Sequence, residues 1–115
     1  MLSTITLSYP TKFFRYTSIN WDHRYSLGQI AQDTYLTSYN DHQFVNSGFG
    51  AVGRYALPLP LPASHEHQYT FSAGTRLICG TVAPQYGQAG GGVEVKTTSS
   101  VTGVRHDVSK PIDDY

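Results

Sequence analysis

Charged side chains are scarce in this sequence of 115 residues. Asp, Glu, Lys and Arg make up 14% of it, against roughly 25% in an average globular protein. The eight acidic and eight basic residues cancel, so the formal net charge is zero. A protein that binds nucleic acid through its phosphates needs a basic face, and one held on anionic lipid needs basic clusters. The composition therefore predicts neither a nucleic-acid nor a membrane partner.

Cysteine and long apolar runs are also nearly absent. The single cysteine, Cys79, excludes an internal disulfide, and its place in "RLICGTV" predicts a buried small hydrophobe rather than a nucleophile. No apolar run approaches the roughly 20 residues that span a bilayer. The opening "MLSTITLSYP" lacks the basic region and apolar core of a signal peptide. We therefore expect that any export depends on something outside this sequence, such as a larger parent chain.

Tyrosine, with nine copies, and glycine, with eleven, are abundant instead. Residues 1–115 suffice for a single domain with one core and one cleft. Alternating apolar residues, and runs rich in aromatic and β-branched residues, predict six or seven short strands. These strands are expected at 4–9, 12–18, 34–39, 67–73, 75–83 and 91–99, with an edge strand at 101–109.

The best helix candidate is "DHRYSLGQIAQDT", residues 22–34. Leu27, Ile30 and Ala31 would share one helical face, although Gly28 weakens a helix. Farther on, "ALPLPLPAS" repeats proline, which cannot donate to a sheet, so we expect an extended loop there. One or two short helices beside short strands predict a fold of the α+β class.

Three consecutive glycines, Gly90, Gly91 and Gly92, directly precede a strand-like run with one carboxylate, Glu94. The glycines fit either a phosphate-binding turn or a flexible hairpin loop, and they match no P-loop or dinucleotide fingerprint. Glu94 is flanked by valines and points to the face opposite them. It is either a solvated strand carboxylate or the floor of a cleft, where it would stabilise positive charge developing on a sugar ring.

Other polar residues offer similar pairs of interpretations. Arg15, among aromatic residues on a strand, and Arg54, after a glycine-rich loop, would each either face solvent or hold a phosphate group. "HEH" puts His65 and His67 on one side of a strand, but no third ligand has suitable spacing, so no metal site is predicted. The sequence also lacks a Ser-His-Asp order and a G-x-S-x-G turn.

The order of these motifs resembles the tuberculosis necrotizing toxin family of NAD-hydrolysing toxin domains. "YLTS", "GRYALPLP", "HQYTF" and "GTVAPQYGQAGGGVEV" carry the resemblance, which runs from Tyr35 to Val95. It implies a small α+β domain with an ADP-ribosyltransferase-like split β-sheet. It also implies an NAD+ glycohydrolase that cleaves the nicotinamide–ribose bond of NAD+ or NADP+, with no cofactor beyond that substrate.

The resemblance assigns roles to individual residues. The catalytic set would be Tyr35 in the substrate pocket, Arg54 on the phosphates, His67 in the site and Glu94 at the position where the family usually has glutamine. The substrate-binding set would be Arg15, Ser38, Gln88 and Gly91. The Asp-Arg-x-Gly that the family has around its first arginine is absent here.

Glutamate at position 94 also resembles mono-ADP-ribosyltransferases, in which Thr37 or Ser38 would brace the glutamate. Arginine-modifying transferases usually carry Glu or Gln two residues earlier, where this chain has Gly92, which favours hydrolysis. A further alternative is a non-enzymatic β-rich binding module that uses its tyrosines and proline loop. The resemblance implies the C-terminal effector part of a secreted parent. It would act in a target-cell cytoplasm and be neutralised by an immunity protein that occludes the cleft.

Overall fold

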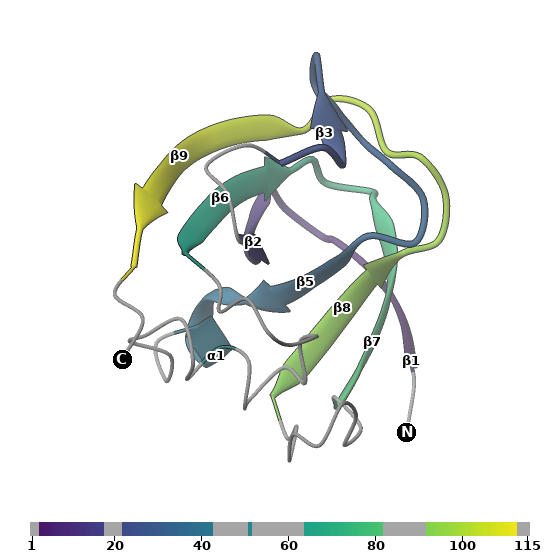
Figure 1. Ribbon diagram of the computed structural model, residues 1–115. Coiled ribbons are helices and arrows are strands. Elements are labelled where there is room, and N and C mark those ends of the chain that lie inside the picture. The colour runs from purple at the N-terminus through teal and green to yellow at the C-terminus, as the bar shows by residue number, and fades with distance from the viewer. Residues whose placement is uncertain (1–2, 18–21, 43–50, 52–63, 82–91, 113–115) are drawn as a thin grey trace.

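The computed structural model describes residues 3–17, 22–42, 51, 64–81 and 92–112. These residues form a nearly all-β structure in which one seven-stranded antiparallel sheet curls around the core, with a two-stranded hairpin beside it (Figure 1). The strand order in the large sheet is β1-β7-β8-β5-β2-β6-β9. The prediction of an α+β fold was therefore wrong, because strands dominate the described part and its helix α1 has four residues.

The elements match most of the predicted strands. They are β1 (Ser3–Thr6), β2 (Thr11–Thr17), β3 (Tyr25–Ser26), β4 (Gln29–Ile30), β5 (Tyr35–Ser38), α1 (Tyr39–His42), β6 (His65–Phe71), β7 (Arg76–Thr81), β8 (Val93–Thr97) and β9 (Arg105–Pro111). The predicted edge strand is confirmed, since β9 pairs only with β6 at one end of the sheet order.

The helix predicted at 22–34 was wrong, because this segment forms the hairpin β3–β4. Both turn residues have positive φ, 48° at Leu27 and 79° at Gly28, as the tight turn of a two-residue hairpin requires. Leu27 is fully exposed, so it is not part of an apolar helical face. Ile30 is buried instead, and its backbone forms a β-bridge with Val101, far away in the sequence.

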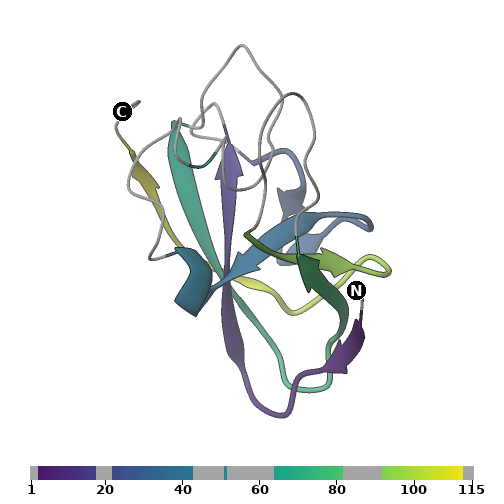
Figure 2. The same cartoon turned by 90° about the horizontal axis from the view of Figure 1, so that it is seen from below.

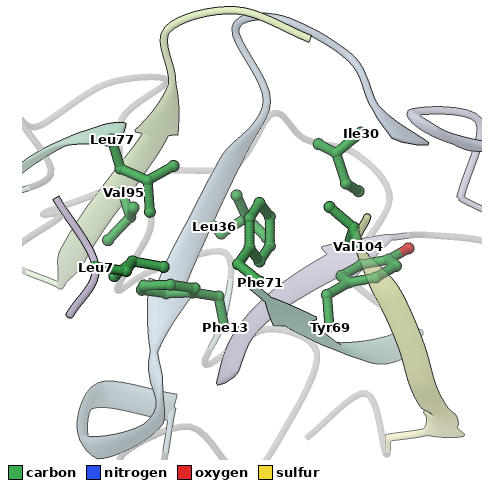
Figure 3. Close-up of a cluster of buried hydrophobic side chains, with 9 residues drawn as sticks. All are labelled: Leu7, Phe13, Ile30, Leu36, Tyr69, Phe71, Leu77, Val95 and Val104. Atoms are coloured by element: carbon green, nitrogen blue, oxygen red, sulfur yellow. The ribbon is translucent and has the colours of Figure 1, made fainter. Parts of the chain in front are cut away.

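The core lies on the inner face of the curled sheet, under the hairpin. Figure 3 shows its nine side chains: Leu7, Phe13, Ile30, Leu36, Tyr69, Phe71, Leu77, Val95 and Val104. The rings of Phe13 and Phe71 meet edge to face at 5.5 Å. Cys79 packs against this cluster as a partly buried free thiol. Burying each such apolar side chain contributes about 1.5–3 kcal/mol, so the inner face stabilises the curl.

The two halves of the sheet join through β5, which changes partner along its length. Its first residues pair with β8, as Tyr35↔Lys96 and Leu36↔Val95, and its last two residues, Thr37 and Ser38, pair with Phe14 and Phe13 of β2. Beyond Phe14, β2 continues alongside β6 alone. Figure 2 shows β2 and β6 running crosswise to β5 and β8. The sheet therefore splits between the second half of β2 and the first half of β5.

Candidate functional site at the sheet split

The strand registers sort the candidate residues onto two faces. We call the face with Phe13, Leu36 and Val95 the inner face, and the opposite one the outer face. Because side chains alternate along a strand, Arg15 of β2 and its register partner His67 of β6 belong to the inner face. Tyr35 of β5 and Glu94 of β8 belong to the outer face.

Arg15 is anchored on the inner face by the carboxylate of Asp22. Its Nε lies 3.0 and 2.9 Å from the two carboxylate oxygens, and the side chains of Arg15 and Asp22 are 16% and 2% exposed. The Nη1 group of Arg15 approaches the backbone carbonyl oxygen of Tyr35 at 3.4 Å. Arg15 therefore lies at the split itself, where β2 and β5 have ceased to pair.

Asp22 gathers further donors around its carboxylate. The hydroxyl of Tyr69 donates to Oδ2 at 2.7 Å, and the backbone N–H of Arg24 donates to Oδ1 at 3.0 Å. Burial alone would raise the pKa of Asp22, but Arg15 and these hydrogen bonds together hold it below its ordinary value. Burial and the neighbouring Asp22 carboxylate raise the pKa of the Tyr69 phenol. Asp22 is therefore ionised and Tyr69 neutral over the physiological range.

His67 is 1% exposed and lies next to this pair in the inner-face network. Its Nε2 is 2.9 Å from the hydroxyl of Thr17, and its Nδ1 is 3.5 Å from Nε2 of His106. Burial, the largest cause, lowers the pKa of His67, and the opposing effect of the Asp22 carboxylate does not cancel it. His67 is thus a neutral imidazole held within the structure rather than a side chain presented to solvent.

Glu94 and Tyr35 occupy the outer face on neighbouring strands. Glu94 pairs with Gly80 of β7, and its side chain is half-buried rather than fully exposed. Tyr35 is 52% exposed, and the ammonium group of Lys96 lies 5.8 Å from its ring centroid. The register Tyr35↔Lys96 puts both of these side chains on the face of Glu94, which is two residues before Lys96. An exposed aromatic ring and a half-buried carboxylate thus lie on the same side of the sheet.

The two residues considered as braces for the glutamate are placed differently. Thr37 is buried and alternates with Leu36, so it shares the outer face with Glu94, and its hydroxyl donates to Asp41 at 3.3 Å. The hydroxyl of Ser38 accepts the backbone N–H of Asp41 at 3.1 Å and so caps the short helix α1. Between these two, the structure puts only Thr37 on the side of Glu94.

Three other predicted site residues, Arg54, Gln88 and Gly91, lie outside the described residues, as does the proline-rich loop. His65 and His67 do share one face of β6, as the "HEH" pattern predicts. Across the described ranges, no group of three or more His, Cys, Asp or Glu side chains could hold a metal ion. In the same ranges, no helix is long and apolar enough to cross a membrane.

Sequence reasoning missed Asp22, Tyr69 and His106 as members of the inner-face network of Arg15 and His67. "WDHR" offered a local signal, since an aspartate seven residues after a strand arginine can fold back onto it. Tyr69 and His106 come from distant strands, 47 and 84 positions after Asp22, so no spacing in the sequence points to them. The helix predicted over Asp22 also hid its role, because it put this residue at a helix start.

No protein-family model matches the chain, and no curated protein matches its sequence. Among solved structures, the chain is similar to one described as Rhs1-CT in complex with cognate immunity protein RhsI1, with a TM-score of 0.69. The match covers 97% of this chain and 82% of that chain at 14% sequence identity. Such low identity shows a shared fold, while function has to be argued from the site.

Proposed function

We propose that this chain, which shares its fold with a domain that has a cognate immunity protein, is a toxin effector domain that consumes NAD+ or NADP+. In this proposal it cleaves the N-glycosidic bond between nicotinamide and ribose and transfers the ribosyl group to water. The partner in the Rhs1-CT complex supports the toxin part of the proposal, because a cell needs immunity only against a harmful protein. The resemblance of the "YLTS" to "GGGVEV" region supports the choice of substrate.

One observation carries the proposal: at the split Arg15 of β2 contacts the backbone of Tyr35 in β5, and the exposed ring of Tyr35 shares the outer face with the half-buried Glu94 of the adjacent strand β8. A dinucleotide has matching groups, since it carries an anionic diphosphate, a flat pyridinium ring and a ribose that becomes cationic as the base leaves.

The proposed reaction does not require a covalent bond between the protein and the substrate. Nicotinamide leaves NAD+ as a neutral molecule, so the main task is to bind the diphosphate and stabilise the oxocarbenium-like ribose. In the proposed arrangement, Arg15 and Arg54 hold the diphosphate, Tyr35 stacks near the nicotinamide ring, and Glu94 offsets the ribosyl charge. His67 supports the strand below Arg15, because its ring is buried and bonded to Thr17.

Glu94→Ala tests the central role. We expect it to reduce NAD+ turnover about 100-fold or more, the usual cost of removing an electrostatic stabiliser of the transition state. Asp107→Asn is a matched control, since this carboxylate lies on the edge strand β9, away from β5 and β8. Full activity in Glu94→Ala would contradict the role. Glu94→Gln is uninformative for the fold, because the resembling family uses glutamine there.

The products separate the alternatives. Nicotinamide together with free ADP-ribose indicates hydrolysis, which the missing side chain at Gly92 favours. A labelled macromolecule indicates a mono-ADP-ribosyltransferase, for which the supporting observation is that Thr37 lies on the same face of the sheet as Glu94. Intact NAD+ would leave a binding module, with the half-exposed Tyr35 and Tyr39 as its contact residues.

The proposal includes a cognate immunity protein that covers the split. Tyrosine is enriched among residues that dominate binding energy; Tyr35, at the split, is 52% exposed, and Tyr39, directly after β5, is 53% exposed. Co-expression with the immunity protein should therefore protect cells and block NAD+ cleavage by the pure domain. Contacts at Arg54 or Glu94 are expected, and an inhibitory complex that leaves the split open would count against occlusion.

A further inference from the structure

The guanidinium of Arg15 has donors left over after its contacts within the fold. Nε is bonded to Asp22, and Nη1 makes one long contact with the carbonyl oxygen of Tyr35. Within the part of the chain that the structure describes, Nη2 has no hydrogen-bond partner, yet no buried side-chain nitrogen or oxygen there lacks one. Nη2, on the Nη1–Nη2 edge of the guanidinium, is therefore not fully buried, and the Arg15 side chain as a whole is 16% exposed.

Asp22 is built to hold that edge in place. Four contacts converge on its carboxylate, two from Nε of Arg15, one from the Tyr69 hydroxyl and one from the Arg24 backbone N–H. The Asp22 side chain is 2% exposed, and Tyr69 is fully buried. Because a guanidinium is planar and rigid, fixing Nε also fixes the direction of the opposite edge.

The Nη1–Nη2 edge keeps two N–H groups on Nη2 and one on Nη1, which suffices for an oxyanion fork. Two parallel N–H donors of arginine match two oxygens of a phosphate group, and a fork held in advance loses less conformational entropy on binding. A surface arginine would instead sample many rotamers and contact any anion weakly.

We propose that Asp22 and Tyr69 are positioning residues that orient Arg15 as a diphosphate-binding fork at the split between β2 and β5. The inference deepens the proposed function, because it assigns the residues that prepare the site for the diphosphate of a dinucleotide. Asp22 does not touch the substrate; it acts through Arg15.

The direction in which Asp22→Asn changes the affinity for an anion distinguishes a positioning role from a simple effect of charge. Asp22→Asn removes a negative charge beside Arg15, so charge balance alone predicts tighter anion binding. If Asp22 positions the fork, Asp22→Asn weakens binding instead, by roughly tenfold, the equivalent of one charge-assisted hydrogen bond. Tyr69→Phe leaves the charge unchanged and removes one donor to Asp22, so it should weaken binding several-fold.

The probes are inorganic pyrophosphate and ADP-ribose, titrated by calorimetry into wild type, Arg15→Lys, Asp22→Asn and Tyr69→Phe. Asp107→Asn is the matched control, because Asp107 also pairs with an arginine and a β6 hydroxyl but lies on the edge strand. We expect binding by wild type and the control, and weaker binding by the other three variants. Thermal unfolding of each variant shows that it is folded at the titration temperature.

Two results overturn the inference: a wild type that binds neither probe, or an Asp22→Asn variant that is folded and binds as tightly as wild type. Failure of the proposed function looks different. Suppose that wild type binds both probes, that Asp22→Asn weakens this binding, and that NAD+ stays intact. The anion site is then supported and the glycohydrolase activity is contradicted. If NAD+ is cleaved, Asp22→Asn should raise KM far more than it lowers kcat.

Discussion

Two arginine–aspartate pairs of this protein are built alike, because in each the aspartate accepts a hydroxyl from β6. The two hydroxyls lie on opposite faces of that strand. On the inner face, Arg15 pairs with Asp22, which accepts the hydroxyl of Tyr69; on the outer face, Arg105 pairs with Asp107, which accepts the hydroxyl of Thr70. Tyr69 and Thr70 are consecutive in β6, so alternation sends their side chains to opposite faces.

The two pairs differ in their exposure to water. The side chains of Arg15 and Asp22 are 16% and 2% exposed, whereas those of Arg105 and Asp107 are 71% and 13% exposed. Water screens the second pair, and an exposed ion pair contributes about 0–1 kcal/mol. A buried pair is costly to form and far costlier to break from one side, which leaves an uncompensated charge. We therefore expect that the stability of the fold depends strongly on the buried pair Arg15–Asp22 and only weakly on the exposed pair Arg105–Asp107.

The outer pair has a local task. The β6–β9 register shifts between Gln68 and Tyr69, and Asp107 accepts hydrogen bonds from both Gln68 and Thr70 at this bulge. Burial would raise the pKa of Asp107, but these bonds and those from Arg105 hold it below its ordinary value. Asp107 thus ties an irregular edge strand to the sheet, while Asp22 ties the start of the hairpin segment to the core.

The largest difference in stability between the two pairs is expected when each aspartate is removed. Asp22→Ala should lower the free energy of unfolding by about 3 kcal/mol or more, because it leaves Arg15 charged in the interior. Asp107→Ala should cost about 1 kcal/mol, as Arg105 remains in water. Urea unfolding followed by circular dichroism measures both, and equal costs would show that burial does not distinguish the pairs.

A smaller difference in stability is expected between the variants that remove the hydroxyls of Tyr69 and Thr70. Tyr69→Phe keeps the ring, whose centroid lies 4.9 Å from that of His106, but removes the donor to a buried carboxylate, at a cost of about 1.5–3 kcal/mol. Thr70→Val removes the corresponding donor on the outer face and should cost about 1 kcal/mol or less. The same urea titration applies, and a greater loss for Thr70→Val would reverse the comparison.

The smallest expected effect is a pH dependence confined to the inner face. Burial lowers the pKa of His67 in the folded protein, so the unfolded chain takes up its proton first as the pH falls below the ordinary value of 6.5. The stability that His67 provides is complete above that pH and declines below it. Asp22 and Asp107 both have lowered pKa values and lose their contribution only below about pH 3.8.

Unfolding measured between pH 7 and pH 5 checks this prediction. Wild type should lose stability over that interval, and His67→Gln should lose less. The control His23→Gln replaces a histidine whose side chain is exposed. An unchanged slope in His67→Gln would mean that another group titrates there.

Much of the strand layout could be predicted because its signals are local. Phe13 and Leu36 belong to short runs of aromatic and β-branched or apolar residues, and these runs became β2 and β5. The hairpin could not be predicted in the same way, since Leu27 with positive φ is unusual and Ile30 is buried by a bridge to Val101. A helical spacing of apolar residues at 22–34 was therefore misleading.

The candidate site was predictable as a set of residues but not as an arrangement. Arg15, Tyr35 and Glu94 stand out by residue type and by motif order, yet their faces depend on how β2, β5 and β8 are aligned. Placing His67 with Glu94 in one catalytic group did not anticipate that the register sends their side chains to opposite faces. A shift of one residue in either pairing would have reversed the sides.

The amino-acid order alone determined which side chains alternate along each strand, because a strand has a two-residue period regardless of its neighbours. Only the tertiary structure decided which of the two faces is covered, which carboxylate meets Arg15, and where β2 and β5 part. Those outcomes depend on contacts between segments far apart in the chain, since burial and the loss of water screening arise only when the strands have assembled.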